Sequence, residues 1–339
     1  MKEAMIYEKL GRGDVKCHLC AHNCLIHDAK RGLCAVRENQ NGTLYSLVYG
    51  KVISMQIDPI EKKPLFHFLP GTTSLSIATV GCNFWCKHCQ NYEISQYPHE
   101  EKFEIPGKEM TPGEIVNAAL EHGCRSISYT YTEPTIFFEF AHDCAQLARS
   151  KGIRNVFVSN GYTGPEAARL IAPLLDANNI DLKGSDSFYR NICGARLQPV
   201  QETIRLMKEL GVWVEVTTLI IPDLNDSDAD LTAIAEFIAS VDPAIPWHVS
   251  QFHPTYKLMD RPKTPVATLR KAREIGLKAG LKYVYEGNVP GEGGENTYCP
   301  ACSTLLIKRL GYRILENRLR GNRCAECNVP VEGVWGEVI

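Results

Sequence analysis

The chain has 339 residues, of which 44% are hydrophobic and 22% charged, and its 37 basic against 39 acidic residues leave a net charge of −2. This composition excludes a disordered chain, and the near-zero charge gives the whole molecule no attraction for nucleic acid or an anionic membrane. No apolar stretch approaches the roughly 18 residues of a membrane span, and the start lacks a signal core. We therefore expect a cytoplasmic protein without membrane contact.

The first 70 residues are predicted to form a small module. It holds four cysteines and a hairpin-like pair of strands, 43–50 and 51–58, around Gly50. The segment 58–71 is rich in turn residues and is interpreted as a connection. From there to residue 286 strand-like and helical segments alternate. The strand-like runs are 75–80, 126–131, 155–160, 178–183, 212–221 and 247–252. Helices are predicted to start near Thr111, Pro134, Gly164, Pro199, Ser227 and Val266.

Six repeats of strand and helix predict parallel pairing, because each crossover helix returns the chain to the same end of the sheet. An open doubly wound sheet and a barrel both fit this pattern. In either case the chemistry belongs in the loops that follow the strands. We predict a Cys-rich module and hairpin over 1–70, the α/β domain over 71–290 and a second four-cysteine module over 291–339.

Cysteine is the unusual component of the composition. Eleven of the fourteen cysteines fall into three tight groups, and in a reducing compartment such groups are typical of metal ligands rather than disulfides. The groups are Cys17, Cys20, Cys24 and Cys34; Cys82, Cys86 and Cys89; and Cys299, Cys302, Cys324 and Cys327. The central group, GCNFWCKHCQN, directly follows the first strand of the α/β segment. Three thiolates are too few for a closed zinc site, unless a distant residue supplies a fourth ligand, and they would leave one iron of a 4Fe-4S cluster open.

This C-x3-C-x2-C loop after the first strand resembles the radical S-adenosylmethionine (SAM) superfamily. The resemblance implies a partial (β/α)6 barrel of the TIM type. It also implies a 4Fe-4S cluster on Cys82, Cys86 and Cys89 that binds SAM at its open iron. Reductive cleavage of SAM would give a 5′-deoxyadenosyl radical that takes a hydrogen atom from a substrate. The substrate class stays open between a glycyl-radical protein, RNA and a small molecule, as does the C–S bond that is cleaved.

Further motifs resemble the glycyl-radical-enzyme activases, relatives of the pyruvate formate-lyase-activating enzyme. In YTEP, Glu133 would hold the methionine amino group, although an acid beside Pro134 also suits a helix start. The resemblance implies catalytic roles for Asp181 and Lys183 of DLKGSD. The remaining implied cofactor-binding residues are His253 of QFHPTYK, Asn160 of SNG and Asn83.

Almost the whole chain resembles the radical SAM enzymes of the AmmeMemoRadiSam system, through CHLCAHNC, KRGLCAVREN, LYSLVYGK, DPIEKKPLFHFLPG, GCNFWCKHCQNYEISQ and the terminal cysteines. That resemblance implies Memo-like and AMMECR-type partners. A radical SAM enzyme also needs a low-potential electron donor. The competing hypothesis is a metal-scaffolded module that binds RNA or protein without turnover. An electron-transfer protein is a third class, which three rather than four central cysteines disfavour.

The two flanking groups have different spacings. Cys299, Cys302, Cys324 and Cys327 form paired knuckles, which indicate Zn2+ in a ribbon-like module. Residues 308–323 between the knuckles carry six basic residues and one acidic residue, which fits either a solvated face or a dock for RNA or an acidic partner. The spacing of Cys17, Cys20, Cys24 and Cys34 does not decide between zinc and a second iron–sulfur cluster. Cys193, in a loop after the fourth strand, is interpreted as an ordinary small residue.

Overall fold

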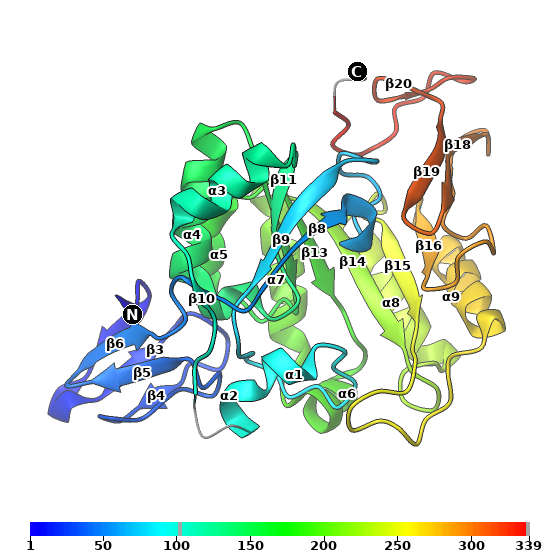
Figure 1. Ribbon diagram of the computed structural model, residues 1–339. Coiled ribbons are helices and arrows are strands. Elements are labelled where there is room, and N and C mark those ends of the chain that lie inside the picture. Colours follow the sequence, from blue (N-terminus) through cyan, green and yellow to red (C-terminus); the bar gives the residue numbers. More distant parts are fainter. Residues whose placement is uncertain (101–103, 337–339) are drawn as a thin grey trace.

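The computed structural model describes residues 1–100 and 104–336 (Figure 1). Its centre is one eight-stranded sheet in the order β16-β15-β14-β13-β12-β11-β9-β8. The strands of this sheet from β9 to β16 pair in parallel, β10 not being among them, and β8 lies antiparallel to β9 at one edge. The strands are β8 (Ser54–Pro59), β9 (Thr73–Ala78), β11 (Ser126–Tyr129), β12 (Arg154–Ser159), β13 (Ala177–Asp181), β14 (Trp213–Ile220), β15 (Trp247–Gln251) and β16 (Val284–Gly287). The predicted α/β fold with a partial, open barrel is therefore confirmed.

Helices connect successive strands, as the sequence pattern predicts. Figure 1 shows α3, α4 and α5 at one end of the sheet and α8 and α9 at the other. Thr111 begins α3 with a capping box to Glu114, and the Ser227 hydroxyl accepts from the backbone N–H of Asp230 at the start of α8. The helices are α3 (Pro112–Glu121), α4 (Phe138–Ser150), α5 (Pro165–Ile171), α7 (Leu197–Glu209), α8 (Asp228–Val241) and α9 (Val266–Lys278). Every residue of β11 and β15 is buried, as expected for parallel strands covered on both faces.

The predicted hairpin around Gly50 is wrong. β6 (Thr43–Ser46) pairs with β5 (Arg37–Gln40) and β1 (Lys2–Glu3), whereas β7 (Lys51–Val52) pairs with β10 (Lys108–Glu109). Gly50 has φ +73° and its carbonyl accepts a 2.7 Å hydrogen bond from Met110, so the turn sends the chain toward β10. The rest of the second predicted strand is β8, which completes the central sheet. The short strand β16 was missed because its four residues follow α9 without a pattern of their own.

Small antiparallel sheets flank the central sheet on opposite sides, the N-terminal one in blue and the C-terminal one in orange and red in Figure 1. The N-terminal module also contains β2 (Tyr7–Lys9), β3 (Val15–Cys17) and β4 (Leu25–Ile26). The C-terminal module contains β17 (Thr297–Tyr298), β18 (Leu305–Leu310), β19 (Arg313–Asn317), β20 (Leu319–Arg320) and β21 (Arg323–Cys324). The domain boundaries at residues 70 and 290 remain predictions. Among the described residues, no helix combines the length and apolar character of a membrane span.

A buried polar network joins the central sheet to the segment before β9 and to the C-terminal module. Glu215 accepts hydrogen bonds from the backbone N–H groups of Phe66 and His67 at 3.0 and 2.8 Å. His248 Nε2 lies 2.7 Å from the same carboxylate. Arg309 donates to the carbonyl of Phe66 at 2.8 Å. Because these groups are buried, their mutual pairing fixes how the two segments sit on the barrel.

Candidate functional site

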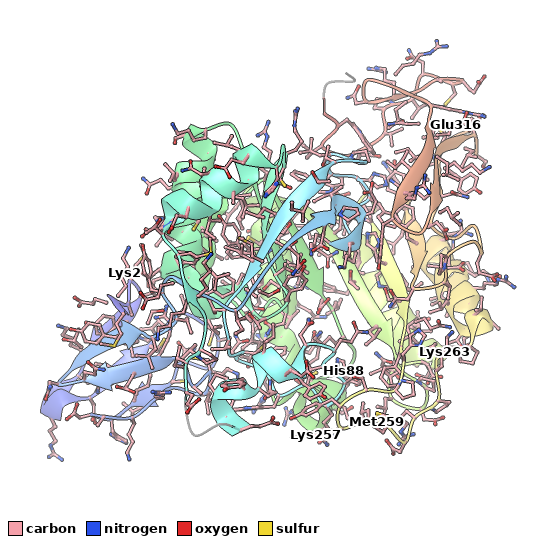
Figure 2. All side chains as sticks on the ribbon, in the orientation of Figure 1. Lys2, His88, Lys257, Met259, Lys263 and Glu316 are labelled. Carbon is pink, nitrogen blue, oxygen red and sulfur yellow. The ribbon has the colours of Figure 1, made fainter. Side chains whose placement is uncertain are left out.

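A cavity of about 490 Å³ opens at the carboxyl ends of the parallel strands. This is the end of an α/β sheet where ligands bind, and the volume falls in the range of small-molecule sites. Figure 2 shows His88, from the loop after β9, at this lower end, whereas Glu316 of the C-terminal module lies at the upper end. The predicted site residues among its lining are Cys82, Cys86, Cys89, Glu133, Asn160, Asp181 and Lys183.

The three cysteines of the central group come together on the loop that leaves β9. The loop turns at Gly81, whose φ is +95°. The backbone N–H of Phe84 donates to the Cys82 sulfur at 3.4 Å, and the Ser95 hydroxyl lies 3.2 Å from the Cys89 sulfur. Such contacts hold two of the three sulfurs at the cavity wall. Short elements that complete this end of the molecule are α1 (Tyr92–Ser95), α2 (Tyr97–Glu100) and α6 (Asp186–Phe188).

Glu133 lies after β11, buried between two strand ends. Its Oε1 accepts from the backbone and hydroxyl of Thr135 at 2.9 and 2.6 Å and from the Ser159 hydroxyl at 2.9 Å. Its Oε2 accepts one bond, from the backbone N–H of Asn160 at 2.7 Å. Burial raises the pKa of Glu133, and these donors lower it. The expected helix cap is thus present, and Oε2 accepts no second hydrogen bond from the residues that the structure describes.

The two predicted asparagines form a pair behind the cysteines. Asn160 Nδ2 donates to Asn83 Oδ1 at 2.7 Å and lies 3.8 Å from the Cys82 sulfur. Asn160 lines the cavity, whereas Asn83 is fully buried beneath it. Asn160 therefore can touch a ligand, and Asn83 holds it in place.

Asp181 and Lys183 face the cavity from the end of β13 as an ion pair with a 2.6 Å Nζ–Oδ2 separation. The Tyr189 hydroxyl donates to the Asp181 carbonyl at 3.1 Å and accepts from the Lys183 N–H at 3.0 Å, which fixes the turn. Cys193 follows in a π-helical turn, and its sulfur lies within 4.8 Å of the Cys86 sulfur. The Cys193 thiol, assisted by the Lys183 charge, lowers the pKa of Cys86 against the effect of burial. The prediction that Cys193 is an ordinary residue therefore missed its contact with the cluster loop.

His253 is a second predicted cofactor-binding residue, besides Asn83, that does not line the cavity. β15 ends at Gln251, and Phe252 is fully buried with its N–H bonded to the Thr264 hydroxyl at 2.9 Å. Consecutive side chains in extended backbone point to opposite sides. The next residue, His253, is exposed and does not line the cavity, so its cofactor-binding role stays a prediction without support from the cavity.

The cavity has a further wall that sequence reasoning interpreted as a mere connection. Lys63 is buried with its Nζ 2.7 Å from Asp58 Oδ2 and 4.4 Å from the Tyr131 ring centroid. Burial lowers the pKa of Lys63 to about 8, while Asp58 opposes that shift. Glu61 also lines this wall, and Tyr312 reaches it from the C-terminal module. The signal in the sequence was the apolar segment 64–69 after the charged run, because an exposed connection does not need apolar side chains.

The C-terminal cysteines form a compact group. The sulfurs of Cys299 and Cys327 are 3.5 Å apart and those of Cys302 and Cys324 are 3.7 Å apart. All four sulfurs lie within 4.8 Å of one another, so this group could hold a metal.

The basic run between the C-terminal knuckles is less uniform than its sequence indicates. Arg309 is buried and donates to the Thr297 hydroxyl at 2.7 Å, so it serves packing. Arg318 is paired with Glu316 at 2.6 Å. The predicted docking face therefore lacks Arg309, and its partner remains a proposal.

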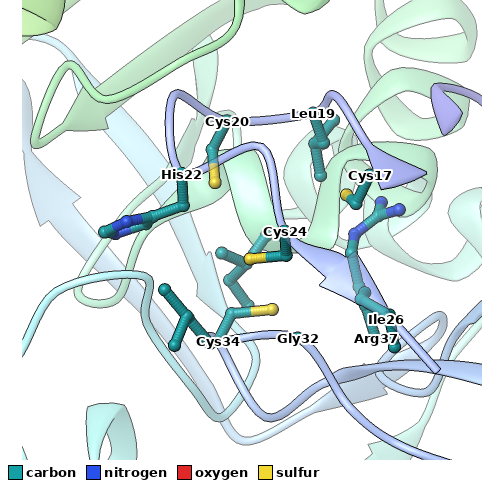
Figure 3. Close-up of a pocket in the computed structure, with 11 residues that line it drawn as sticks. Cys17, Leu19, Cys20, His22, Cys24, Ile26, Gly32, Cys34 and Arg37 are labelled. Atoms are coloured by element: carbon teal, nitrogen blue, oxygen red, sulfur yellow. The ribbon is translucent and has the colours of Figure 1, made fainter. Parts of the chain in front are cut away.

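The four N-terminal cysteines lie away from the cavity, around a separate pocket that they share with His22 and Arg37 (Figure 3).

Comparisons with known proteins agree with this geometry. Residues 76–238 match the Radical SAM superfamily. The chain is 50% identical over 335 residues to an uncharacterized protein of Methanocaldococcus jannaschii, covering 98% of this chain and 99% of that one. It is 25% identical over 223 residues to a putative glycyl-radical enzyme activating enzyme of the same organism, covering 63% and 81% of the two chains. A radical SAM methyltransferase structure from Sphaerobacter thermophilus has a TM-score of 0.51 at 16% identity, covering 70% of this chain and 71% of that one.

The family implies a 4Fe-4S cluster and SAM, and the residues of the cavity fit both. Three thiols project from one loop, Glu133 Oε2 has a free lone pair, and the buried Nδ1 of His88 has no partner in the described part of the chain. The chain belongs to the radical SAM superfamily and is an enzyme of the radical SAM type.

Proposed function

We propose that the cavity binds a 4Fe-4S cluster through Cys82, Cys86 and Cys89 and binds SAM beside it. The observation that carries the proposal is the arrangement of these three cysteines, from one loop, around the same cavity as Glu133 and the Asp181–Lys183 pair. When bound, a cluster reduced by an external low-potential donor would pass one electron to the sulfonium of SAM, and cleavage of a C–S bond to give methionine would leave a 5′-deoxyadenosyl radical able to take a hydrogen atom from the substrate.

The residues of the chain prepare the cavity for these groups. Glu133 Oε2 is held by the Asn160 backbone and offers its free lone pair to the amino group of SAM. Asp181 holds the Lys183 ammonium at 2.6 Å, and the charge of Lys183 favours the thiolate of Cys86. These contacts hold the Glu133 carboxylate and the Lys183 ammonium in fixed positions at the cavity, which is the kind of preorganisation that favours binding of charged groups.

The substrate would lie against the outer wall of the cavity, formed by Glu61, Lys63 and Tyr312. Charged and hydroxyl groups there favour a substrate with polar groups over an apolar one. The activating-enzyme relatives support a protein substrate, and RNA and small molecules are the alternatives to be compared in the same assay.

The test is cleavage of SAM by anaerobically purified, reduced protein, with the nucleoside product identified by mass spectrometry. The wild type should form 5′-deoxyadenosine, and Cys86→Ala should form at least about 100-fold less, which corresponds to about 3 kcal/mol. Cys124→Ala is the matched control, since Cys124 is a buried cysteine that does not line the cavity. Undiminished product from Cys86→Ala would refute the assignment. A wild type without cleavage but with salt-sensitive RNA binding would favour the non-enzymatic alternative.

We also propose Zn2+ at the C-terminal cysteines. Zn–S bonds of about 2.3 Å in a tetrahedron place the sulfurs about 3.8 Å apart, and the 3.5 and 3.7 Å separations of these sulfurs support this ion. A Cys302→Ser/Cys327→Ser variant should lose one zinc per chain. An unchanged zinc content would contradict the proposal.

Membership of the AmmeMemoRadiSam system, with Memo-like and AMMECR-type partners, is a proposal supported by the sequence resemblance. The requirement for a low-potential electron donor is likewise a proposal. Co-purification of the tagged chain with the Memo-like and AMMECR-type proteins, from cells that encode them, tests membership of the system. A reproducible absence of both proteins would count against that membership.

A further inference from the structure

The four N-terminal cysteines surround one small pocket. Cys17 ends β3, Cys20 and Cys24 lie in the loop before β4, and Cys34 lies in the turn before β5. Figure 3 shows the sulfurs of Cys20, Cys24 and Cys34 directed into the space between the two loops, with Cys17 beside Arg37. The His22 ring is turned away from the sulfurs, toward the rest of the molecule. The ligand set of this pocket is therefore four thiols without a histidine.

The separation of the sulfurs distinguishes a single ion from a cluster. In the C-terminal module all four sulfurs lie within 4.8 Å of one another, as a tetrahedral zinc site requires. For the N-terminal cysteines, all of which the structure describes, no three sulfurs meet that limit. The central triplet, Cys82, Cys86 and Cys89, shares this wider spacing. An iron–sulfur cube is larger than one ion, so the cysteines that hold it stand farther apart.

A buried arginine points to a negatively charged occupant. Arg37 is 1% exposed and lines the pocket, and its Nη2 pairs with the buried carboxylate of Glu139. Its Nε and Nη1 are buried without a partner in the described structure. An unpartnered buried N–H is costly, by roughly 1–3 kcal/mol. A metal centre bound by four thiolates carries net negative charge and offers sulfur acceptors, which would satisfy both groups.

The pocket lies directly against the loop of the central cysteines. The Cys34 carbonyl oxygen is 3.1 Å from the position of a Cβ at Gly81, the residue before Cys82. His22 Nε2 lies 2.8 Å from the carbonyl oxygen of Asn83, the residue after Cys82. No layer of structure separates the two cysteine loops.

From the sulfur spacing, the unpartnered arginine and this location, we propose that Cys17, Cys20, Cys24 and Cys34 hold a second iron–sulfur cluster, of the 4Fe-4S class, with Arg37 as its charge-compensating neighbour. This proposal goes beyond the proposed function and does not depend on it, since the central cluster uses other cysteines.

The experiment removes the three cysteines that bind the central cluster and measures the iron and sulfide that remain per chain. The full-length Cys82→Ala/Cys86→Ala/Cys89→Ala variant, produced and reconstituted anaerobically, should keep about four irons and four sulfides per chain. After reduction it should show a cluster signal by electron paramagnetic resonance that added SAM does not change. Loss of all iron, with about two zinc ions per chain, would overturn the proposal. The C-terminal zinc is identified in parallel with Cys302→Ser/Cys327→Ser.

A second measurement keeps the proposal testable if the triple variant does not fold. Wild-type protein should hold about eight irons per chain, and Cys20→Ser/Cys24→Ser should hold about four, with the SAM-responsive signal retained. Four irons in both proteins would overturn the proposal. An Arg37→Gln/Glu139→Gln variant should lower the midpoint potential of the SAM-insensitive signal, because Arg37 lines the pocket and Glu139 does not, so the loss of the nearer positive charge dominates and disfavours the more negative reduced cluster. An unchanged potential would remove Arg37 from the proposal.

Discussion

Gly81 sits where the N-terminal cysteine loop meets the loop of the central cysteines, and replacing it tests that contact. A Cβ at residue 81 would lie 2.6 Å from Val36 Cγ1 and 3.1 Å from the Cys34 carbonyl oxygen, at a φ of +95°. Gly280 is a matched control, because its φ is +97° and no described atom lies within 4 Å of its Cβ position. Gly81→Ala and Gly280→Ala therefore impose similar backbone strain, and only Gly81→Ala adds a steric clash with Val36 and the Cys34 carbonyl oxygen.

The backbone strain of a left-handed alanine is about 1–2 kcal/mol, and it should be the whole effect of Gly280→Ala. Gly81→Ala should add an overpacking cost of about 1–3 kcal/mol, since both atoms that its Cβ meets are buried. For folded units of this size, that difference corresponds to a melting temperature roughly 2–12 °C lower than that of Gly280→Ala. The assay is thermal melting of both anaerobically loaded variants, followed by circular dichroism.

A second substitution shows whether the clash itself is responsible. Val36→Ala removes the methyl group nearest to residue 81, so it should restore part of the stability of Gly81→Ala although it is destabilising in the wild type. Equal melting temperatures for Gly81→Ala and Gly280→Ala, or the absence of any rescue by Val36→Ala, would refute the contact described between the two loops.

Three further predictions concern the cavity. Lys63 has a pKa lowered to about 8 by burial, so between pH 8 and about 10.4 the unfolded chain binds a proton that the folded chain lacks. The free energy of unfolding of the wild type, measured in urea relative to Lys63→Met, should therefore rise from pH 8 to pH 10, and a difference that does not change over this range would contradict the lowered pKa of Lys63. Asp181→Asn should slow SAM cleavage about 10- to 100-fold, because it leaves the largely buried Lys183 ammonium without its partner, and Asp186→Asn, at a partly exposed residue that does not line the cavity, should change it less than about twofold. His253→Ala should also change the rate less than about twofold, and a loss above tenfold would place this residue in the site after all.

Local patterns in the sequence determined the chemistry and the main chain path of the central domain. The C-x3-C-x2-C spacing places three thiols on one short loop, and the alternation of strand and helix requires parallel pairing whatever the rest of the chain does. The structure places Glu133 and the Asp181–Lys183 pair at the cavity, because they follow strands directly and strand ends meet at one edge of a parallel sheet. Their roles toward SAM and substrate stay predictions.

Contacts between distant segments needed the tertiary structure. β8 became the eighth strand of the sheet because Gly50 turns the chain away from the predicted hairpin. Cys193 meets Cys86 across more than one hundred residues, and Lys63 and Tyr312 line the cavity from segments that precede and follow the barrel in the sequence. Such pairings depend on packing and on the matching of buried polar groups, and neither leaves a periodic signal in the sequence. The distances between sulfur atoms also depend on the fold. The N-terminal and C-terminal modules each contribute four cysteines, but only in the C-terminal module do all four sulfurs lie within 4.8 Å of one another.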